Sequence, residues 1–192
     1  ISLVGTLPFL AAVNPSVPVR TIKELIGHAK ANPGKLNYAS IGRGGINHLA
    51  VELFKLMVNV DMVHIPYKGA GQALTDLIGG QIQLFFGSTV ATLPHVRTGK
   101  VRGIAVTTLR RSAAAPDLPT ISESGVPGYD ATQWYGIWGP PKLPANIVAR
   151  LNDEIGRILA LPEVKNRFAQ EGMELTRSSP EEFRRHLQAE IE

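Results

Sequence analysis

The chain contains no cysteine, and aromatic residues make up only 6% of its 192 residues. The absence of cysteine excludes a disulfide framework, a thiolate nucleophile and a cysteine-ligated metal. No apolar run approaches the length of a transmembrane helix, so we expect no direct insertion into a membrane. With so few aromatic residues, the core is expected to be mostly aliphatic.

The sequence also lacks any block of five like charges, although its formal net charge is +4. The longest basic runs are the pairs Arg110-Arg111 and Arg184-Arg185, and no aromatic residues interleave with them to stack on bases. We therefore expect no nucleic-acid partner. The mild positive excess instead suits an acidic small molecule.

Three short apolar runs each end in a turn rich in glycine or hydroxyl residues, and a helical periodicity follows each turn. The runs are residues 36–40, 62–65 and 82–86. A further strand-like run at 101–107 continues the alternation, which is typical of a mostly parallel sheet with helices on both faces. Parallel strands would bring the three turns to one edge of the sheet, where helix N-termini favour an anion. The sequence therefore predicts an α/β receptor for a small anion.

Changes in composition, and the proline and glycine residues between periodic segments, divide the chain into three parts. Residues 1–13 form two short predicted strands broken at Pro8, residues 14–130 form the α/β unit, and residues 131–192 form a strand followed by helices. We interpret the chain as a fragment, because it opens inside a strand-like segment, carries no signal peptide and ends while a helical pattern continues.

Local signals mark several helices within these parts. Capping boxes at residues 21–24 and 179–182 predict helix starts. The helix predicted after the first turn shows an apolar residue at each position of a helical stripe, namely Leu49, Leu53, Leu56 and Met57.

The three turns supply the candidate ligand-binding residues. The first turn (residues 41–45) offers glycines that let backbone amides approach a ligand, the second (66–71) adds an aromatic residue, a lysine and two glycines, and the third (87–89) adds two hydroxyls. The candidates are Ser40, Gly42, Arg43, Gly44, Gly45, Asn47, His48, Tyr67, Lys68, Gly69, Ala70, Gly71, Ser88 and Thr89.

Each candidate group also has a simpler structural interpretation. The first turn is equally consistent with an ordinary connection between a strand and a helix, and Lys68 with a solvated surface lysine. Ser88 and Thr89 suit a helix N-cap, a role that is compatible with ligand binding. For His48, packing or capping is the stronger interpretation and hydrogen bonding to a ligand the weaker one.

Other common site types lack their signatures. The segment Gly42-Arg43-Gly44-Gly45 is neither a dinucleotide fingerprint nor a P-loop, so we predict no cofactor. The histidines show no metal-ligand spacing, and we predict no metal site. No Gly-x-Ser-x-Gly elbow occurs, and Asp76 is the one carboxylate near the predicted edge, so we predict that the protein is not an enzyme.

An ordered set of short motifs runs over essentially the whole chain. It includes Asn37-Tyr38-Ala39-Ser40 followed by Gly-x-Gly, then His48-Leu49, His64-Ile65-Pro66-Tyr67-Lys68-Gly69, Pro116-Asp117-Leu118-Pro119-Thr120 and Trp134-Tyr135-Gly136. In this order the motifs resemble the Bug/TctC family, the periplasmic solute-binding receptors of tripartite tricarboxylate transporters. The ordered set is specific, although no single motif is.

The resemblance implies a type II periplasmic-binding-protein fold, here with one complete α/β domain and a partial second domain around a ligand cleft. Residues 1–13 would be crossing strands of the hinge region, 14–130 ligand-binding domain 2, and 131–192 part of an incomplete domain 1. The implied ligand is a small carboxylate: a di- or tricarboxylate, an acidic amino acid or an aromatic acid. The implied location is the periplasm, and the implied partners are the membrane permease subunits.

This sequence departs from the family pattern at two turns. Many members carry Asp where it has Gly87-Ser88, and a hydroxyl residue is common where it has Gly45. Loss of the carboxylate makes the site less repulsive to an anion.

The residues alone leave two other classes of function open. A ligand-sensing regulatory domain of a transcription factor shares the general fold, and an enzyme acting on a carboxylate is disfavoured by the lack of a nucleophile–base set.

Overall fold

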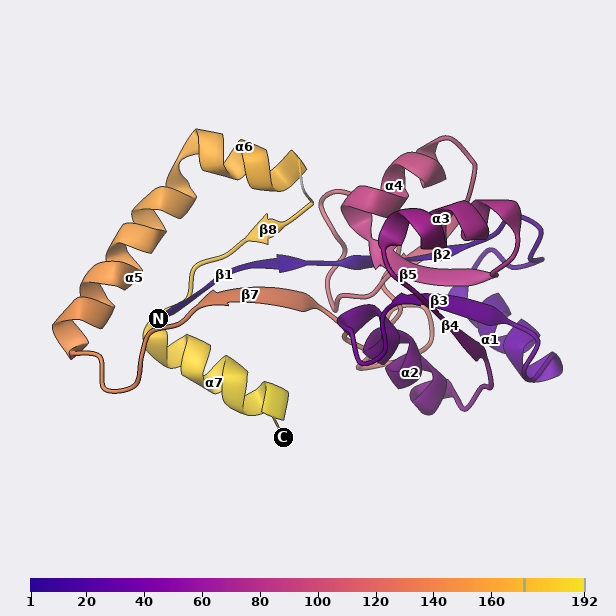
Figure 1. Cartoon of the computed structure of the whole chain (residues 1–192), viewed down its shortest axis with the longest axis horizontal. Helices are drawn as coiled ribbons and strands as arrows, with labels where there is room; N and C mark the ends of the chain where they lie inside the picture. The colour runs from indigo at the N-terminus through magenta and orange to yellow at the C-terminus, as the bar shows by residue number, and fades with distance from the viewer. Residues whose placement is uncertain (171, 192) are drawn as a thin grey trace. The chain divides into compact units, whose positions relative to one another are not determined.

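The computed structural model describes residues 1–170 and 172–191, and the chain divides into two compact units (Figure 1). Unit 1 consists of residues 1–7 together with the chain from residue 133 onward, and unit 2 consists of residues 8–132. The predicted break at Pro8 is confirmed, since it separates β1 (Ser2–Leu7) from β2 (Phe9–Val13). The first strand belongs to unit 1 and the second to unit 2.

Unit 2 is built on a five-stranded sheet in the order β4-β3-β5-β2-β6. Its other strands are β3 (Asn37–Ile41), β4 (Val63–Tyr67), β5 (Leu84–Ser88) and β6 (Arg102–Val106). The prediction of a mostly parallel sheet is confirmed, because β3 runs parallel to both β4 and β5. The exception is β2, which lies antiparallel between β5 and β6.

Helices cover both faces of this sheet, as the alternation predicts (Figure 1). The helices α1 (Ile22–Ala31) and α2 (Ile46–Val58) pack on one face, and α3 (Ala70–Gly79) and α4 (Thr89–Arg97) pack on the other. Every residue of β2 is buried, because alternate side chains enter the two apolar clusters. A strand covered on both faces reads as a continuous apolar run, which is the pattern of Phe9–Val13.

The predicted helix start at residues 21–24 is confirmed by its cap. The Thr21 Oγ1 atom accepts a hydrogen bond from the Glu24 backbone N–H at 3.1 Å. The Glu24 carboxylate accepts from the backbone N–H of Arg20, one residue before the cap. The first of these bonds satisfies an amide that the first helical turn leaves without a partner, and the second holds the residue before the cap.

The buried face of α2 is not the apolar stripe that the sequence periodicity shows. The buried residues are Asn47, Ala50, Val51 and Phe54, whereas Leu49, Leu53, Leu56 and Met57 are exposed. The helix carries two apolar stripes, and contact with the sheet selects the one that holds Phe54. The ring of Phe54 packs edge-on against Phe86 and Tyr129.

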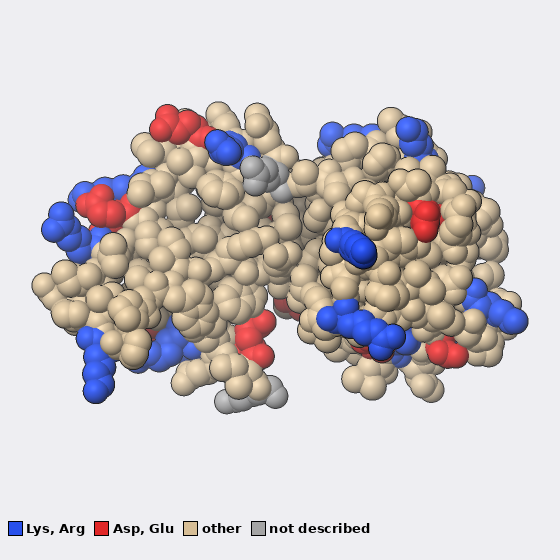
Figure 2. Space-filling model, viewed as in Figure 1, with Lys and Arg blue, Asp and Glu red and all other residues tan. Residues whose placement is uncertain are grey.

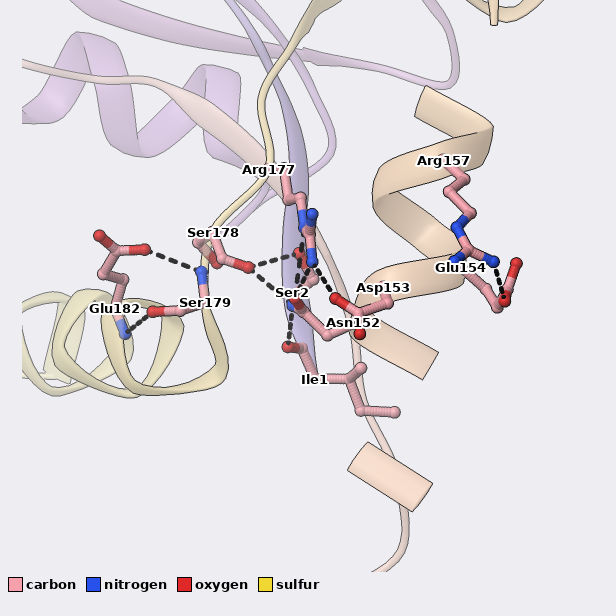
Figure 3. A network of polar contacts seen from close by, with 10 residues as sticks. All are labelled: Ile1, Ser2, Asn152, Asp153, Glu154, Arg157, Arg177, Ser178, Ser179 and Glu182. Carbon is pink, nitrogen blue, oxygen red and sulfur yellow. Dashed lines mark hydrogen bonds and ion pairs between the residues drawn. The ribbon is translucent and has the colours of Figure 1, made fainter. Parts of the chain in front are cut away.

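Unit 1 contains a three-stranded antiparallel sheet in the order β7-β1-β8. Its further elements are β7 (Gln133–Ile137), α5 (Ala145–Ala160), α6 (Pro162–Gln170), β8 (Glu174–Leu175) and α7 (Pro180–Ile191). The predicted capping box before α7 is confirmed: the Glu182 N–H donates to the Ser179 hydroxyl, and the Ser179 N–H donates to the Glu182 carboxylate (Figure 3). The hydrogen bond from the Ser179 backbone N–H to the carboxylate is the largest cause that lowers the pKa of Glu182.

Asn152 of α5 joins three segments of unit 1 (Figure 3). Its Nδ2 atom donates to the carbonyl oxygens of Ile1 at 3.1 Å and Ser178 at 2.8 Å. Its Oδ1 atom accepts from Arg177 Nη2 at 2.6 Å. Asn152 is 6% exposed, and loss of its side chain would leave the two half-buried backbone carbonyls with fewer donors.

Replacing Asn152 by alanine is expected to destabilise unit 1 by about 2 kcal/mol, because several hydrogen bonds of a buried side chain are lost together. Chemical denaturation followed by tryptophan fluorescence measures this loss. The matched control is Arg157→Ala on the same helix, which removes an exposed ion pair with Glu154 and is expected to cost less than about 0.5 kcal/mol. Equal losses in the two variants would contradict the assignment of Asn152 as the joining residue.

Candidate functional site

The three turns of unit 2 lie at one edge of the sheet. In the β3–β4 ladder the last pair is Ile41 with Tyr67, so the two strands end together. The Gly42 N–H donates to the Tyr67 carbonyl at 3.1 Å and ties the first turn to the second. The parallel pairing of β3 with β5 brings the third turn to the same edge. The predicted convergence of the turns is therefore present.

Three helices begin at this edge without a side-chain cap. The N-cap residues are Gly45 for α2, Gly69 for α3 and Ser88 for α4, and none makes a side-chain capping bond. No acidic residue lies in the first turn of any of the three. Uncapped first-turn amides and the helix dipoles give this edge a positive character, which suits a bound anion.

The first turn needs its glycines for two separate reasons. Gly42 and Gly44 adopt φ angles of 83° and 74°, a left-handed conformation that other residues rarely adopt. At Gly45 an added Cβ would lie 2.9 Å from the Ile41 carbonyl oxygen, so the backbone itself fills that space. A residue with a side-chain hydroxyl at position 45, which is common in the family that the sequence resembles, would require this turn to shift. Arg43, between the left-handed glycines, is exposed.

Three of the predicted site residues are buried and hold the edge together. The Ser40 hydroxyl donates to the Gly42 carbonyl at 2.9 Å, and the Asn47 Nδ2 atom donates to the Phe86 carbonyl at 2.9 Å. The Thr89 hydroxyl donates to the Pro8 carbonyl at 2.8 Å. The structure gives each of these side chains a protein partner, and their direct contact with a ligand stays a prediction.

His48 contacts the first turn from α2. Its Nδ1 atom accepts a hydrogen bond from the Gly44 N–H at 3.3 Å. Its ring lies 4.1 Å from that of His64, centroid to centroid, and the Tyr38 ring stacks on His64 at 5.1 Å. A supporting role for His48 is therefore present in the structure, in line with the packing and capping interpretation.

His64 is the residue that the sequence argument did not select. Its Nε2 atom lies 2.5 Å from the Ser40 hydroxyl oxygen. The available signal was the strand register: His64 pairs with Tyr38, and Tyr38 and Ser40 share one face of β3 because side chains alternate along a strand. Burial lowers the pKa of His64, and the positive charges of His48 and Arg43 lower it further.

A second polar group lies behind this histidine pair. The Tyr38 hydroxyl donates to the Glu52 carboxylate, and Lys55 Nζ lies 2.7 Å from Glu52 Oε1. Burial and then Glu52 raise the pKa of Tyr38. Burial opposes the ionisation of Glu52, but the hydrogen bonds from Lys55 and Tyr38 outweigh it, so the pKa of Glu52 is lowered. Glu52 is therefore held as a carboxylate.

In the second turn the side chain of Tyr67 is hydrogen-bonded and that of Lys68 is exposed to solvent. The Tyr67 hydroxyl donates to Asp76 Oδ2 at 2.7 Å, and burial followed by Asp76 raises the pKa of Tyr67 to about 12. Tyr67 is thus a neutral donor that already has an acceptor. Lys68 is exposed, and Ala70 and Gly71 form the first turn of α3.

The third turn is tightly packed at Gly87. An added Cβ there would lie 2.3 Å from Thr92 Oγ1 and 2.5 Å from a ring carbon of Phe85. The Asp that many members of the resembled family carry near this position would therefore need both neighbours to move if it replaced Gly87. Ser88 is half-buried at the N-terminus of α4.

The arrangement can hold a small anion by backbone amides, with Arg43 and Lys68 as exposed cations nearby. Within residues 1–170 and 172–191, no three His, Asp or Glu side chains form a group suited to a metal ion. No helix in the same part of the chain combines the length and hydrophobicity needed to span a bilayer. On the face in Figure 2, Lys and Arg are scattered among uncharged residues.

Comparison with known proteins gives consistent matches. The family model of the tripartite tricarboxylate transporter family receptor matches residues 1–192. Protein BugT of Bordetella pertussis is 32% identical over 192 residues, covering 100% of this chain and 59% of BugT. The chain therefore spans about three-fifths of the length of this relative.

Two solved structures from Rhodopseudomonas palustris share the fold. Rpa4515 with adipate is 35% identical with a TM-score of 0.83, over 98% of this chain and 63% of that one. MatC with bound malate is 29% identical with a TM-score of 0.74, over 90% of this chain and 59% of that one. The predicted α/β periplasmic-binding-protein fold, with one domain and part of a second, is confirmed. Since the family model matches its entire length, the chain belongs to the receptor family of tripartite tricarboxylate transporters.

Proposed function

We propose that this chain is part of a solute receptor that binds a small dicarboxylate at the edge formed by the three turns of unit 2. The observation that carries the proposal is the convergence of three uncapped helix N-termini with no acidic residue in their first turns. Such amides stabilise a carboxylate by hydrogen bonds and by the helix dipole. The relatives solved with adipate and malate support a dicarboxylate as the class of ligand.

The proposal assigns different roles to the predicted site residues. Direct contacts would come from the first-turn amides of α2, α3 and α4, with the exposed Arg43 and Lys68 and the half-buried Ser88 beside them. Three buried side chains would act indirectly, because their hydrogen bonds to backbone carbonyls stabilise the edge of the sheet; they are Ser40, Asn47 and Thr89. The remaining candidates, Gly42, Gly44, Gly45, His48, Tyr67, Gly69, Ala70 and Gly71, would shape the three turns.

The receptor role extends to the rest of the transport system. We infer that the protein binds its ligand in the periplasm without chemical conversion and delivers it to membrane permease subunits. The support for this is membership of a receptor family whose solved members include periplasmic binding proteins. Ser40, beside His64, is fully buried and donates its proton to the Gly42 carbonyl, a geometry that suits a structural hydroxyl.

The first experiment is a thermal-shift and calorimetric titration with adipate, malate, citrate and glutamate, each compared with its neutral ester or amide. We expect at least one free acid to raise the melting temperature, because a ligand that binds the native state stabilises it by mass action, by about 2.7 kcal/mol at a hundredfold excess over Kd. The neutral derivatives are expected to give no shift. Equal shifts from acids and esters would contradict a carboxylate site.

The position of the site is tested by Gly71→Asp, which places a negative charge in the first turn of α3. Gly71 is exposed and no atom lies within 4 Å of an added Cβ, so the helix itself should tolerate or favour the change. Repulsion between like charges is expected to weaken binding of a dianion at least about tenfold.

The matched control is Gly71→Asn, which has nearly the same shape without the charge. It is expected to bind within about threefold of the parent chain, since only the repulsion is absent. If both variants bind alike, the ligand lies away from the N-terminus of α3.

A further inference from the structure

The tautomers of the two histidines beside the first turn follow from their hydrogen bonds. Ser40 has one hydroxyl hydrogen and donates it to the Gly42 carbonyl, so its oxygen must accept from His64. His64 therefore carries a hydrogen on Nε2. The Nδ1 atom of His48 accepts from the Gly44 N–H, so this nitrogen carries no hydrogen.

The two histidines thus stabilise both glycines of the turn that adopt positive φ angles. The Gly42 carbonyl accepts a hydrogen bond from Ser40, which in turn accepts one from His64. The Gly44 amide donates a hydrogen bond to His48. Glycines have no side chains with which to fix their own conformation, and both adopt positive φ angles here. The shape of the turn therefore depends on the two imidazole rings, which lie 4.1 Å apart.

Protonation affects the two contacts differently. A second hydrogen on His64 would go to Nδ1 and leave its Nε2–H bond to Ser40 in place. A second hydrogen on His48 would go to Nδ1 and face the Gly44 N–H, donor against donor, so that bond would be lost. The acid-sensitive contact of the turn is therefore the one between His48 and Gly44.

Charged groups of the first turn and of α2 act on His64. Arg43 lies in the turn, Glu52 and Lys55 lie on α2, and the Tyr38 ring stacks against both imidazoles. For His64, burial and the positive charges of His48, Arg43 and Lys55 disfavour a proton, whereas Glu52 favours one. His64 consequently stays neutral further into the acidic range than an ordinary histidine.

We propose that His48 and His64 are positioning residues of the carboxylate site, and that the first turn keeps its binding shape only while His48 is neutral. The inference rests on the proposed function for its ligand, but the shape of the turn can be measured without one. Binding of a dicarboxylate then weakens on acidification, beyond the effect of protonating the ligand itself.

The experiment follows the Gly42 and Gly44 amide signals by NMR in the ligand-free protein from about pH 8 to about pH 5, a range that spans ordinary histidine titration. Adipate affinity is measured in parallel. In the parent chain the Gly44 signal is expected to move with pH. Adipate affinity is expected to fall on acidification about fivefold more than in the control, because one hydrogen bond is lost.

The control is His48→Asn, whose side-chain oxygen can accept from the Gly44 N–H but does not titrate. Its Gly44 signal in the ligand-free protein should therefore not move with the protonation of residue 48. Its affinity ratio between the two pH values should show only the titration of the ligand, which is common to both proteins. For His64, Gln retains an N–H donor for Ser40 and Leu does not, so His64→Gln is expected to preserve the Gly42 signal that His64→Leu shifts.

The outcomes separate the two proposals. A Gly44 signal that titrates in the parent chain but not in His48→Asn, with no adipate binding in either, supports the positioning role and counts against the dicarboxylate ligand. A Gly44 signal that titrates equally in both proteins overturns the positioning role. Binding that strengthens on acidification relative to His48→Asn also overturns it, because His48 would then act as a cation for the ligand.

Discussion

Replacing Phe54 by alanine is expected to destabilise unit 2 by about 4 kcal/mol, the range measured for truncating a large buried aromatic side chain. Phe54 is 0% exposed, and its ring lies 6.0 Å from Phe86 and 6.2 Å from Tyr129 in edge-on contacts. The truncation removes these contacts and leaves a cavity between α2 and the sheet. Chemical denaturation followed by circular dichroism, with hydrogen exchange in β3 and β5, measures the loss.

The control for this variant is Leu56→Ala, two residues further along the same helix. Leu56 is 80% exposed, so its truncation is expected to change stability by less than about 0.5 kcal/mol. The pair of variants tests which apolar stripe of α2 is buried. A larger loss for Leu56→Ala than for Phe54→Ala would mean that the helix packs by the other face.

Replacing Gly136 by alanine is expected to destabilise unit 1 by about 3 kcal/mol, at the upper end for overpacking of a core. An added Cβ at Gly136 would lie 2.1 Å from the Cζ atom of Phe183. Phe183 is 2% exposed and packs edge-on against Trp134 and Trp138, so a shift of its ring disturbs both contacts. The Phe183 ring, the strand β7 or the helix α7 must therefore move.

Gly27→Ala in α1 is the matched control with the opposite sign. No atom lies within 4 Å of an added Cβ at Gly27, and alanine is the better helix former, so unit 2 is expected to gain about 0.5 to 1 kcal/mol. The chain has two tryptophans, Trp134 and Trp138, and both lie in unit 1, so their fluorescence follows Gly136→Ala selectively. An unchanged fluorescence midpoint in Gly136→Ala would contradict the contact with Phe183.

Local sequence signals predicted most of the elements, because each signal acts over a few residues. Pro8 breaks the first two strands, and the capping boxes start α1 and α7 where they were predicted. The alternation of apolar runs and helical patterns predicted parallel strands with helices on both faces, and with it the convergence of the three turns. The short strand β8 lacked such a signal and was not predicted.

The sequence by itself determined the break at Pro8, the starts of α1 and α7, the alternation of strands and helices in unit 2, and the family to which the chain belongs. Only the tertiary structure decided which stripe of α2 is buried, since two stripes are apolar and contact with Phe86 and Tyr129 selects one. It also decided that β2 lies antiparallel between β5 and β6, and that His64 supports Ser40. These features depend on residues far apart in the chain, and no local pattern encodes which distant partners meet.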